Sequence, residues 1–138
     1  MNRNYISTIT LYSRVMASHT EDRKEKWIRT VIHNCFWKSQ IKTGFSDTAA
    51  ISQNVYTVRI PEDERYRPYA EFVRNPGGCF SISQGDIVIL GECQERITGE
   101  SGHTAAQLLN RYKPNAFQVT AFSDNTTFHV AKHYRLGG

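Results

Sequence analysis

The sequence predicts a small, mainly β fold: an antiparallel β-barrel or sandwich of six to seven strands, with one short α-helix and long loops. Two observations lead to this prediction. Apolar residues alternate with a period of two along most hydrophobic segments, and these segments are rich in β-branched and aromatic residues. The helical period of 3.6 stands out once, in residues 104–112. The length of 138 residues indicates one domain over residues 1–138.

Three strands are expected in the first half of the chain. Residues 6–12 place isoleucine and leucine on one face and threonine and tyrosine on the other. Residues 27–37 carry apolar side chains on both faces, which is typical of a central or a bulged strand. Residues 55–60 alternate cleanly, and Pro61 ends the run.

Two long connections are expected beside these strands. Residues 38–54 are mostly polar, with isolated apolar residues, and predict a long loop. Loops of that length are uncommon in compact domains and are often functional. Residues 61–79 contain Pro68 and Pro76 and predict an excursion over the surface, held down by its aromatic residues.

The second half of the chain predicts shorter elements. Thr104 is expected to cap the helix 104–112, which Pro114 stops. The other expected elements are a short strand at 80–83, a turn at 84–86, a buried strand at 87–91, and a hairpin of strands 116–122 and 126–136.

Composition limits the function classes. The formal net charge is +4, which permits a polyanionic partner without requiring one. No apolar run is long enough for a membrane helix, and the first residues do not form a signal-peptide pattern. Three widely spaced cysteines predict reduced thiols in a cytoplasm rather than a disulfide framework.

The sequence gives no sign of catalysis. It contains no G-x-S-x-G elbow, no P-loop and no H-E-x-x-H motif. We therefore expect no enzyme, no catalytic residue and no cofactor. His129 and His133 would share one face of a strand but lie roughly 13 Å apart at ~3.3 Å per residue, too far to bind one metal ion. We therefore expect no metal site. Asp86 is expected to serve the turn.

Basic and aromatic residues alternate in two places, at residues 36–38 and at Arg65, Tyr66, Arg67 and Tyr69. A barrel with exposed aromatic residues and a basic groove can hold a single nucleic-acid strand. The alternative is that the tyrosines pack the segment against the barrel while the arginines are solvated. Acidic residues at positions 62–64 and 71 dilute the local charge. Both readings stay open at this point.

Several short motifs follow one another in a recognisable order. They are Ile-Thr-Leu-Tyr at 9–12, the aromatic-rich run 27–37, residues 55–61, the Gly-Asp turn at 85–86 before a strand that ends in Gly91, and the run from His133 to Gly138. This order resembles that of small proteins from tailed bacteriophages and prophages of Gram-positive bacteria. It is similar in particular to the head-closure proteins, or stoppers, of the neck of long-tailed phages.

The resemblance implies a β-barrel that forms a dodecameric or hexameric ring below the portal. Its partners would be portal and adaptor proteins above, tail-completion and tail-tube proteins below, and packaged double-stranded DNA in the channel. In stoppers a long loop between two strands projects into the channel. Here it would be the loop 38–54, which places Lys38, Ser39, Lys42 and Thr43 near DNA. The protein would be made in the host cytoplasm and reside in the neck of the virion.

Two parts of the chain depart from the simplest stoppers. The excursion within 61–79, with Arg65, Tyr66, Arg67 and Tyr69, and the helix 104–112 are additional elements, and either could dock a neighbour. Three functions therefore stay open: head closure, an adaptor or tail-completion role in the same neck, and single-stranded nucleic-acid binding by a free barrel.

Overall fold

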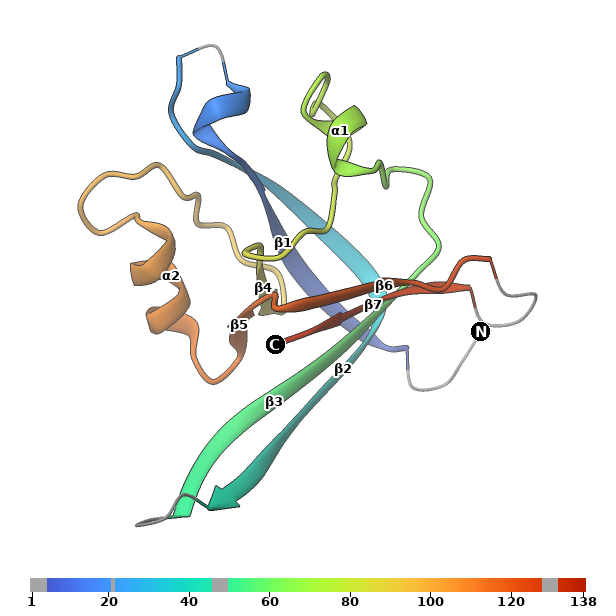
Figure 1. The fold of residues 1–138 in the computed structure, drawn as a ribbon, viewed down its shortest axis with the longest axis vertical. Coiled ribbons are helices and arrows are strands. Elements are labelled where there is room, and N and C mark those ends of the chain that lie inside the picture. Colours follow the sequence, from blue (N-terminus) through green and yellow to red (C-terminus); the bar gives the residue numbers. More distant parts are fainter. Residues whose placement is uncertain (1–4, 21, 46–49, 128–131) are drawn as a thin grey trace.

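The computed structural model describes residues 5–20, 22–45, 50–127 and 132–138. It confirms the expected mainly β fold (Figure 1). The described strands are β1 (Ser7–Val15), β2 (Lys26–Phe45), β3 (Ala50–Pro61), β4 (Ile87–Leu90), β5 (Ala116–Gln118), β6 (Ala121–Asp124) and β7 (His133–Gly137). The helices are the 3₁₀ turn η1 (Ala17–His19), the short α1 (Tyr69–Phe72) and α2 (Ala105–Tyr112).

The seven strands form one antiparallel sheet that curls back toward itself. Their order is β5-β4-β1-β2-β3-β7-β6, so the first and the last strand in this order are consecutive in the chain. Val119 and Thr120 connect them: Val119 N donates to Asp86 O at 2.7 Å, beside β4, and Thr120 N donates to Gly137 O at 2.8 Å, in β7. The segment 116–124 therefore links the two ends of the sheet and gives a barrel-like shape.

Strand β2 is both central and bulged, as its two apolar faces predict. Its first part pairs with β1 as far as Cys35, and its second part pairs with β3 from Phe36 onward. The register with β1 shifts near Ser7, and Asn34 has a φ of 58° in the left-handed region. Such a bulge bends the strand. It lets β2 leave one neighbour and join the next.

The prediction of a long loop at residues 38–54 is wrong. Strand β2 continues to Phe45 and β3 begins at Ala50, with paired positions from Phe36↔Arg59 to Phe45↔Ala50. We call residues 38–45 and 50–54 of these strands the ribbon; it extends away from the rest of the molecule (Figure 1). The prediction failed because the sequence here lacks the apolar alternation that marks a half-buried strand, and residues 38–41 are exposed. Residues 46–49 lie outside the described part.

Two hydrophobic clusters lie on opposite faces of β1. Ile9 and Leu11 point into the barrel-like core with residues such as Val58, Phe117 and Leu136. On the other face of the strand, a second cluster lies beneath α2; it contains Tyr12, Ile87, Ile89, Cys93, Leu108 and Ala116. Thr10 and Tyr12, on the face expected to carry threonine and tyrosine, are therefore buried as well, because α2 and the segment before it cover that side.

The helix expected at 104–112 is confirmed as α2 with Thr104 as its N-cap. The Thr104 hydroxyl accepts from Gln107 N at 3.2 Å, and the Gln107 side chain accepts from Thr104 N at 3.3 Å. This reciprocal pair is a capping box.

Other elements differ from expectation. Residues 80–83 make only one isolated bridge, Tyr66↔Phe80, rather than a strand. The expected strand 116–122 divides into β5 and β6 because the segment changes partner between β4 and β7. The hairpin of the last two strands is confirmed, but β7 begins at His133. His129 lies outside the described residues.

Candidate nucleic-acid interface

The outer surface of strands β2, β3 and β7 carries a group of basic side chains. In the register, Phe36 lies opposite Arg59, and Arg59 lies opposite Arg135. Residues directly opposite each other in a sheet share a face. This face is the outer one, because the neighbours Val58 and Leu136 are buried in the core.

A second row lies beside the first. Lys38 is opposite Thr57, and Thr57 is opposite Gly137. We call Phe36, Lys38, Thr57, Arg59 and Arg135 the cationic face. Its side chains line a groove of about 280 Å³, together with Gln40 and Val55.

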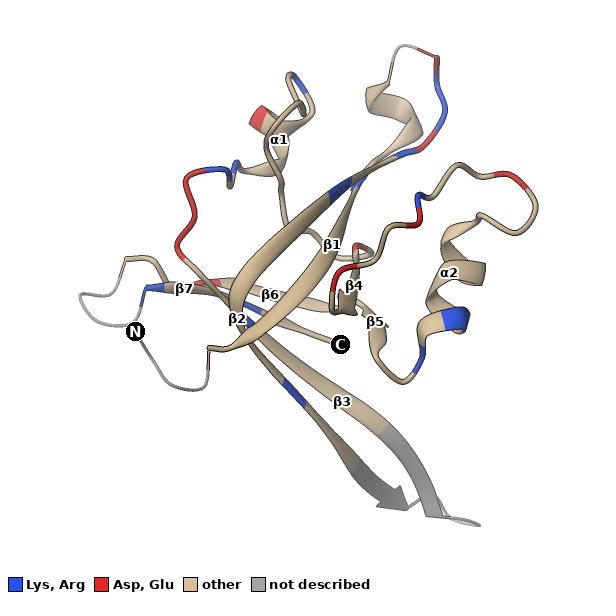
Figure 2. Cartoon of the chain, turned by 180° about the vertical axis from the view of Figure 1, so that it is seen from behind, with Lys and Arg blue, Asp and Glu red and all other residues tan. Residues whose placement is uncertain are grey.

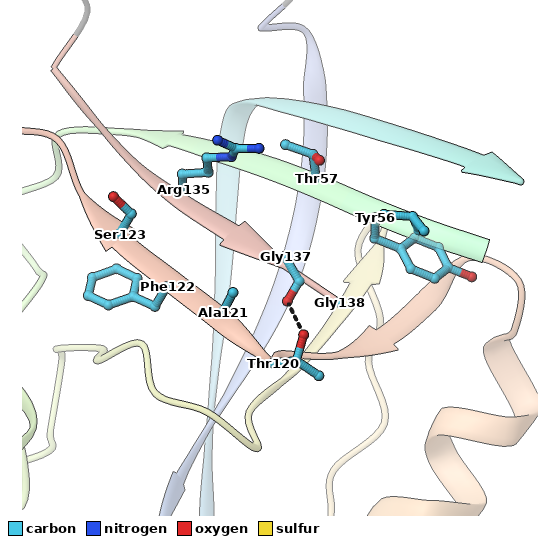
Figure 3. Close-up of a pocket in the computed structure, with 10 residues that line it drawn as sticks. Tyr56, Thr57, Thr120, Ala121, Phe122, Ser123, Arg135, Gly137 and Gly138 are labelled. Atoms are coloured by element: carbon cyan, nitrogen blue, oxygen red, sulfur yellow. Dashed lines mark hydrogen bonds between the residues drawn. The ribbon is translucent and has the colours of Figure 1, made fainter. Parts of the chain in front are cut away.

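A second hollow of about 350 Å³ adjoins this groove. It is lined by residues of β3, β6 and β7 and by Thr120, and it shares Val55, Thr57 and Arg135 with the groove. Figure 3 shows the labelled side chains around it, with the Thr120 hydroxyl bonded to Gly137 O at 3.3 Å. Small residues at Ala121 and Gly137 leave this space open. Together the two hollows form one track across the sheet.

The basic groups of the cationic face are not neutralised within the described part of the chain. No ion pair there involves Lys38, Arg59 or Arg135. The Arg59 guanidinium lies 5.2 Å from the centre of the Phe36 ring, a cation–π distance. Its Nε is buried and has no hydrogen-bond partner among the described groups.

The four residues expected in the projecting loop are placed on the ribbon. Lys38 is exposed and belongs to the cationic face, at the base of the ribbon. Ser39 is exposed, opposite Tyr56. Further along, Lys42 pairs with Gln53 and Thr43 with Ser52 in the backbone register. The structure therefore brings Lys38, and not Ser39, into the basic group.

The second set of expected residues is engaged within the chain. Arg65 forms an ion pair with Asp63 at 2.8 Å, which lowers the pKa of that carboxyl. Arg67 donates through its guanidinium to Glu64 O and Tyr66 O. These arginines stabilise their own segment.

The tyrosines of that set hold the excursion down. Tyr66 packs against Tyr134 with ring centres 4.4 Å apart, and also against Phe80 and Phe122. The Tyr69 hydroxyl accepts from Met16 N at 3.1 Å and bonds the His19 ring at 2.9 Å. The contacts favour the packing interpretation of these aromatic residues over the exposed nucleic-acid platform.

Asp86 lies in the expected turn, but it is also buried, which the sequence did not indicate. It is 1% exposed, and its carboxylate accepts from Arg14 N at 2.9 Å and from Ser83 N at 2.8 Å. Burial raises its pKa to about 7. The carboxyl therefore fastens the turn to β1 and titrates near neutral pH.

The cysteines and other potential ligands show no assembled centre in the part of the chain that is described. Cys35, Cys79 and Cys93 are free thiols, and burial raises the pKa of Cys35 to about 12. No group of three or more histidine, cysteine or acidic side chains is placed to hold a metal ion within the described ranges. Among the helices described there, none has both the length and the apolar character needed to cross a bilayer.

The fold and the basic track define a small, mainly β, barrel-like domain with a cationic sheet face and a projecting ribbon. The chain belongs to a family of unknown function, DUF6751, whose model matches residues 5–138. No curated protein and no solved structure matches it.

The sequence contained a signal for Arg59 that was missed. In residues 55–60 the core positions alternate with outward positions, and Arg59 occupies an outward one. Its position beside Arg135 depends on the register of β3 and β7, which one sequence does not reveal.

Proposed function

We propose that this protein is a structural subunit of the neck of a tailed phage, a head-closure or head–tail connector protein. It forms a ring below the portal, retains packaged DNA and docks the tail. The ribbon carries this proposal: a barrel-like body with a long, protruding two-stranded arm suits a ring subunit whose arm reaches a neighbour or the channel. The sequence resemblance to stoppers supports the same assignment.

The ribbon has unused hydrogen-bonding edges. Strand β1 pairs with β2 no further than Cys35, and the β7 segment pairs with β3 no further than Tyr56, opposite Gly138. Beyond these points each strand has one neighbour among the described residues. Two-stranded hairpins are marginally stable alone in water, and free edges pair readily with other chains. A neighbouring subunit in a ring supplies such a contact.

The ribbon also exposes an apolar side chain. Ile41 is 71% exposed and lies three residues beyond Lys38, at the base of the ribbon. Burying it against a neighbour stabilises an assembly through the hydrophobic effect. Its exposure in the single subunit is expected for a residue that is covered in a ring.

DNA retention requires little charge in each subunit. Lys38 lies at the base of the ribbon and Lys42 lies further along it. A ring repeats these positive charges around its axis, and contacts to phosphate groups add up. A modest net charge of +4 is therefore compatible with a ring that contacts DNA.

The test is electron microscopy of lysates from a phage that carries this gene, with the gene disrupted. We expect heads that package DNA and then lose it, beside free complete tails. Full heads with abnormal tails would move the protein to tail completion, and empty heads without a bound adaptor would favour the adaptor role. Normal infectious particles would overturn the neck proposal.

One observation favours a second candidate. The cationic face has basic groups without carboxylate partners in the described part of the chain, as in proteins that bind single strands. A free nucleic-acid-binding barrel would bind oligonucleotides as an isolated monomer, whereas a neck subunit would contact DNA in the assembled ring. Normal particles in the disrupted phage would make this second function the leading one.

A further inference from the structure

We infer that the cationic face is a binding site for the phosphate groups of a nucleic-acid backbone, with Arg59 and Arg135 as its centre and Lys38 beside them. This inference rests on the second candidate function and names its ligand and residues; it does not depend on the neck assignment, since it concerns the sheet surface of a single subunit.

The first argument is the pairing of like charges. Arg59 and Arg135 are direct cross-strand neighbours, and like charges in that position destabilise a sheet. The nearest acidic residues along these strands are Glu62, after β3, and Asp124, at the end of β6. Both lie at the end of the strands away from Lys38. An anion placed over the two arginines would remove the repulsion.

The second argument is the placement of the Arg59 guanidinium. It lies 5.2 Å from the centre of the Phe36 ring, and no carboxylate pairs with it among the described residues. Its Nε is covered by other atoms of the chain, so an incoming anion would contact the terminal nitrogens of the guanidinium. The planar guanidinium matches the oxygens of a phosphate group, and the ring beneath it limits its movement.

The third argument is the shape of the surface. The groove and the adjoining hollow share Val55, Thr57 and Arg135, so they form a continuous track rather than a closed pocket. Hydroxyl groups of Thr57, Thr120 and Ser123 line it. Arginine, lysine and hydroxyl side chains are the usual partners of nucleic-acid phosphates. An extended polymer with regularly spaced phosphates fits a track better than a single small anion does.

The surroundings of Phe36 indicate how a nucleic-acid strand would be bound. The Arg59 guanidinium lies on one side of the Phe36 ring, and the Tyr5 ring is 6.0 Å away at an angle of 38°. Phe36 therefore offers little free surface for stacking a base. Basic groups with few aromatic platforms bind through phosphates without reading sequence. Figure 2 shows basic positions along β2, whereas most acidic positions lie in the connections outside the strands.

The test measures binding by fluorescence anisotropy with a labelled oligothymidylate and with a mixed-sequence duplex of equal length, over a series of salt concentrations. The target variant is Arg59→Gln with Arg135→Gln. The matched control is Arg74→Gln with Arg96→Gln, which removes the same charge from two exposed arginines elsewhere. Melting curves establish that each variant is folded.

We expect the target variant to lose at least about tenfold in affinity at low salt, and the control to keep nearly all of it. The slope of log affinity against log salt should fall by about 1.4 for the single strand or about 1.8 for the duplex, as two phosphate contacts are lost. The probe that shows this loss identifies the source of the phosphates. Equal losses in target and control, or no loss in either, would overturn the inference.

A second variant keeps the test decisive if the first does not fold. Arg135→Gln with Lys38→Gln changes two exposed side chains and leaves the Arg59–Phe36 contact in place. It should reproduce the loss of affinity and of salt slope with an unchanged melting temperature. Wild-type affinity in this variant would contradict the site. Because all measurements use the isolated subunit, they fail or succeed independently of the phage experiment.

Discussion

At the scale of single residues, the surroundings of a side chain determine its pKa and its effect on stability more than its residue type does. Asp86 is a turn residue by sequence, yet its burial makes it the carboxyl with the most unusual environment among those described. Gly138 is the partner of Tyr56 in the β3–β7 pairing, yet its lack of a side chain is what allows Phe117 to pack there. Each of these contacts leads to a measurement.

The stability of the protein should depend on the ionisation of Asp86. Its pKa rises from 3.8 to about 7 because burial disfavours the charged form. The folded state therefore binds the proton more tightly than the unfolded state does. The protonated carboxyl thus contributes to the free energy of unfolding; this contribution is fully present below about pH 4 and is lost as the pH rises to about 7. Urea denaturation from pH 4 to pH 8 should show wild-type stability falling relative to Asp86→Asn. A constant difference between the two proteins would contradict the raised pKa.

Gly138→Ala should destabilise the fold. A Cβ at this position would lie 2.2 Å from the Phe117 ring and 2.6 Å from the carbonyl oxygen of Gln118, so the backbone must move. Overpacking of this kind costs about 1–3 kcal/mol in the free energy of unfolding. Gly77→Ala is the control, since its nearest contact would be 3.9 Å away. Equal stability of the two variants in urea titrations would show that residues 137–138 can move to accommodate the methyl group at little cost.

At the scale of elements, the sequence predicts those parts that pack against a core and fails where a strand has no apolar alternation. The helix 104–112 and the bulged strand 27–37 have clear apolar patterns, and both are confirmed. The ribbon has none, so 38–54 reads as a loop. The same limit applies to the cationic face: Lys38 was expected near nucleic acid, but Arg59 and Arg135 meet only through cross-strand register.

Removal of the outer part of the ribbon should leave the rest of the protein folded. We expect deletion of residues 43–52, closed by an Asn-Gly turn, to keep a cooperative melt, because all described members of the two hydrophobic clusters lie outside the deleted segment. In the phage, the same deletion should reduce DNA retention. Circular dichroism melting and the yield of DNA-filled particles measure the two effects. A non-cooperative melt would show that the outer ribbon is part of the folding core.

At the scale of the whole molecule, the ribbon and the cationic face make the surface asymmetric. The ribbon extends to one side of the body (Figure 1), and the cationic face lies at its base, on β2, β3 and the neighbouring β7. A subunit of this shape has one arm and one body surface, which suits a head-to-tail contact between neighbours. Such heterologous contacts close into rings when the rotation between subunits allows it. Nucleic acid in such a ring would meet the basic surface of every subunit.

This arrangement predicts different consequences for two exposed isoleucines. Ile41 lies on the ribbon and Ile6 precedes β1, and they are 71% and 79% exposed. Because neither side chain is buried in the subunit, Ile41→Asp and Ile6→Asp should each leave the melting temperature within about 2 °C of the wild type. In the phage, Ile41→Asp should lower the number of infectious particles, whereas Ile6→Asp should not, because only the ribbon is expected to be covered by a neighbour. Plaque counts after complementation measure this difference. Equal yields from the two variants would place the subunit contact elsewhere, and the ribbon would then have to act on DNA alone.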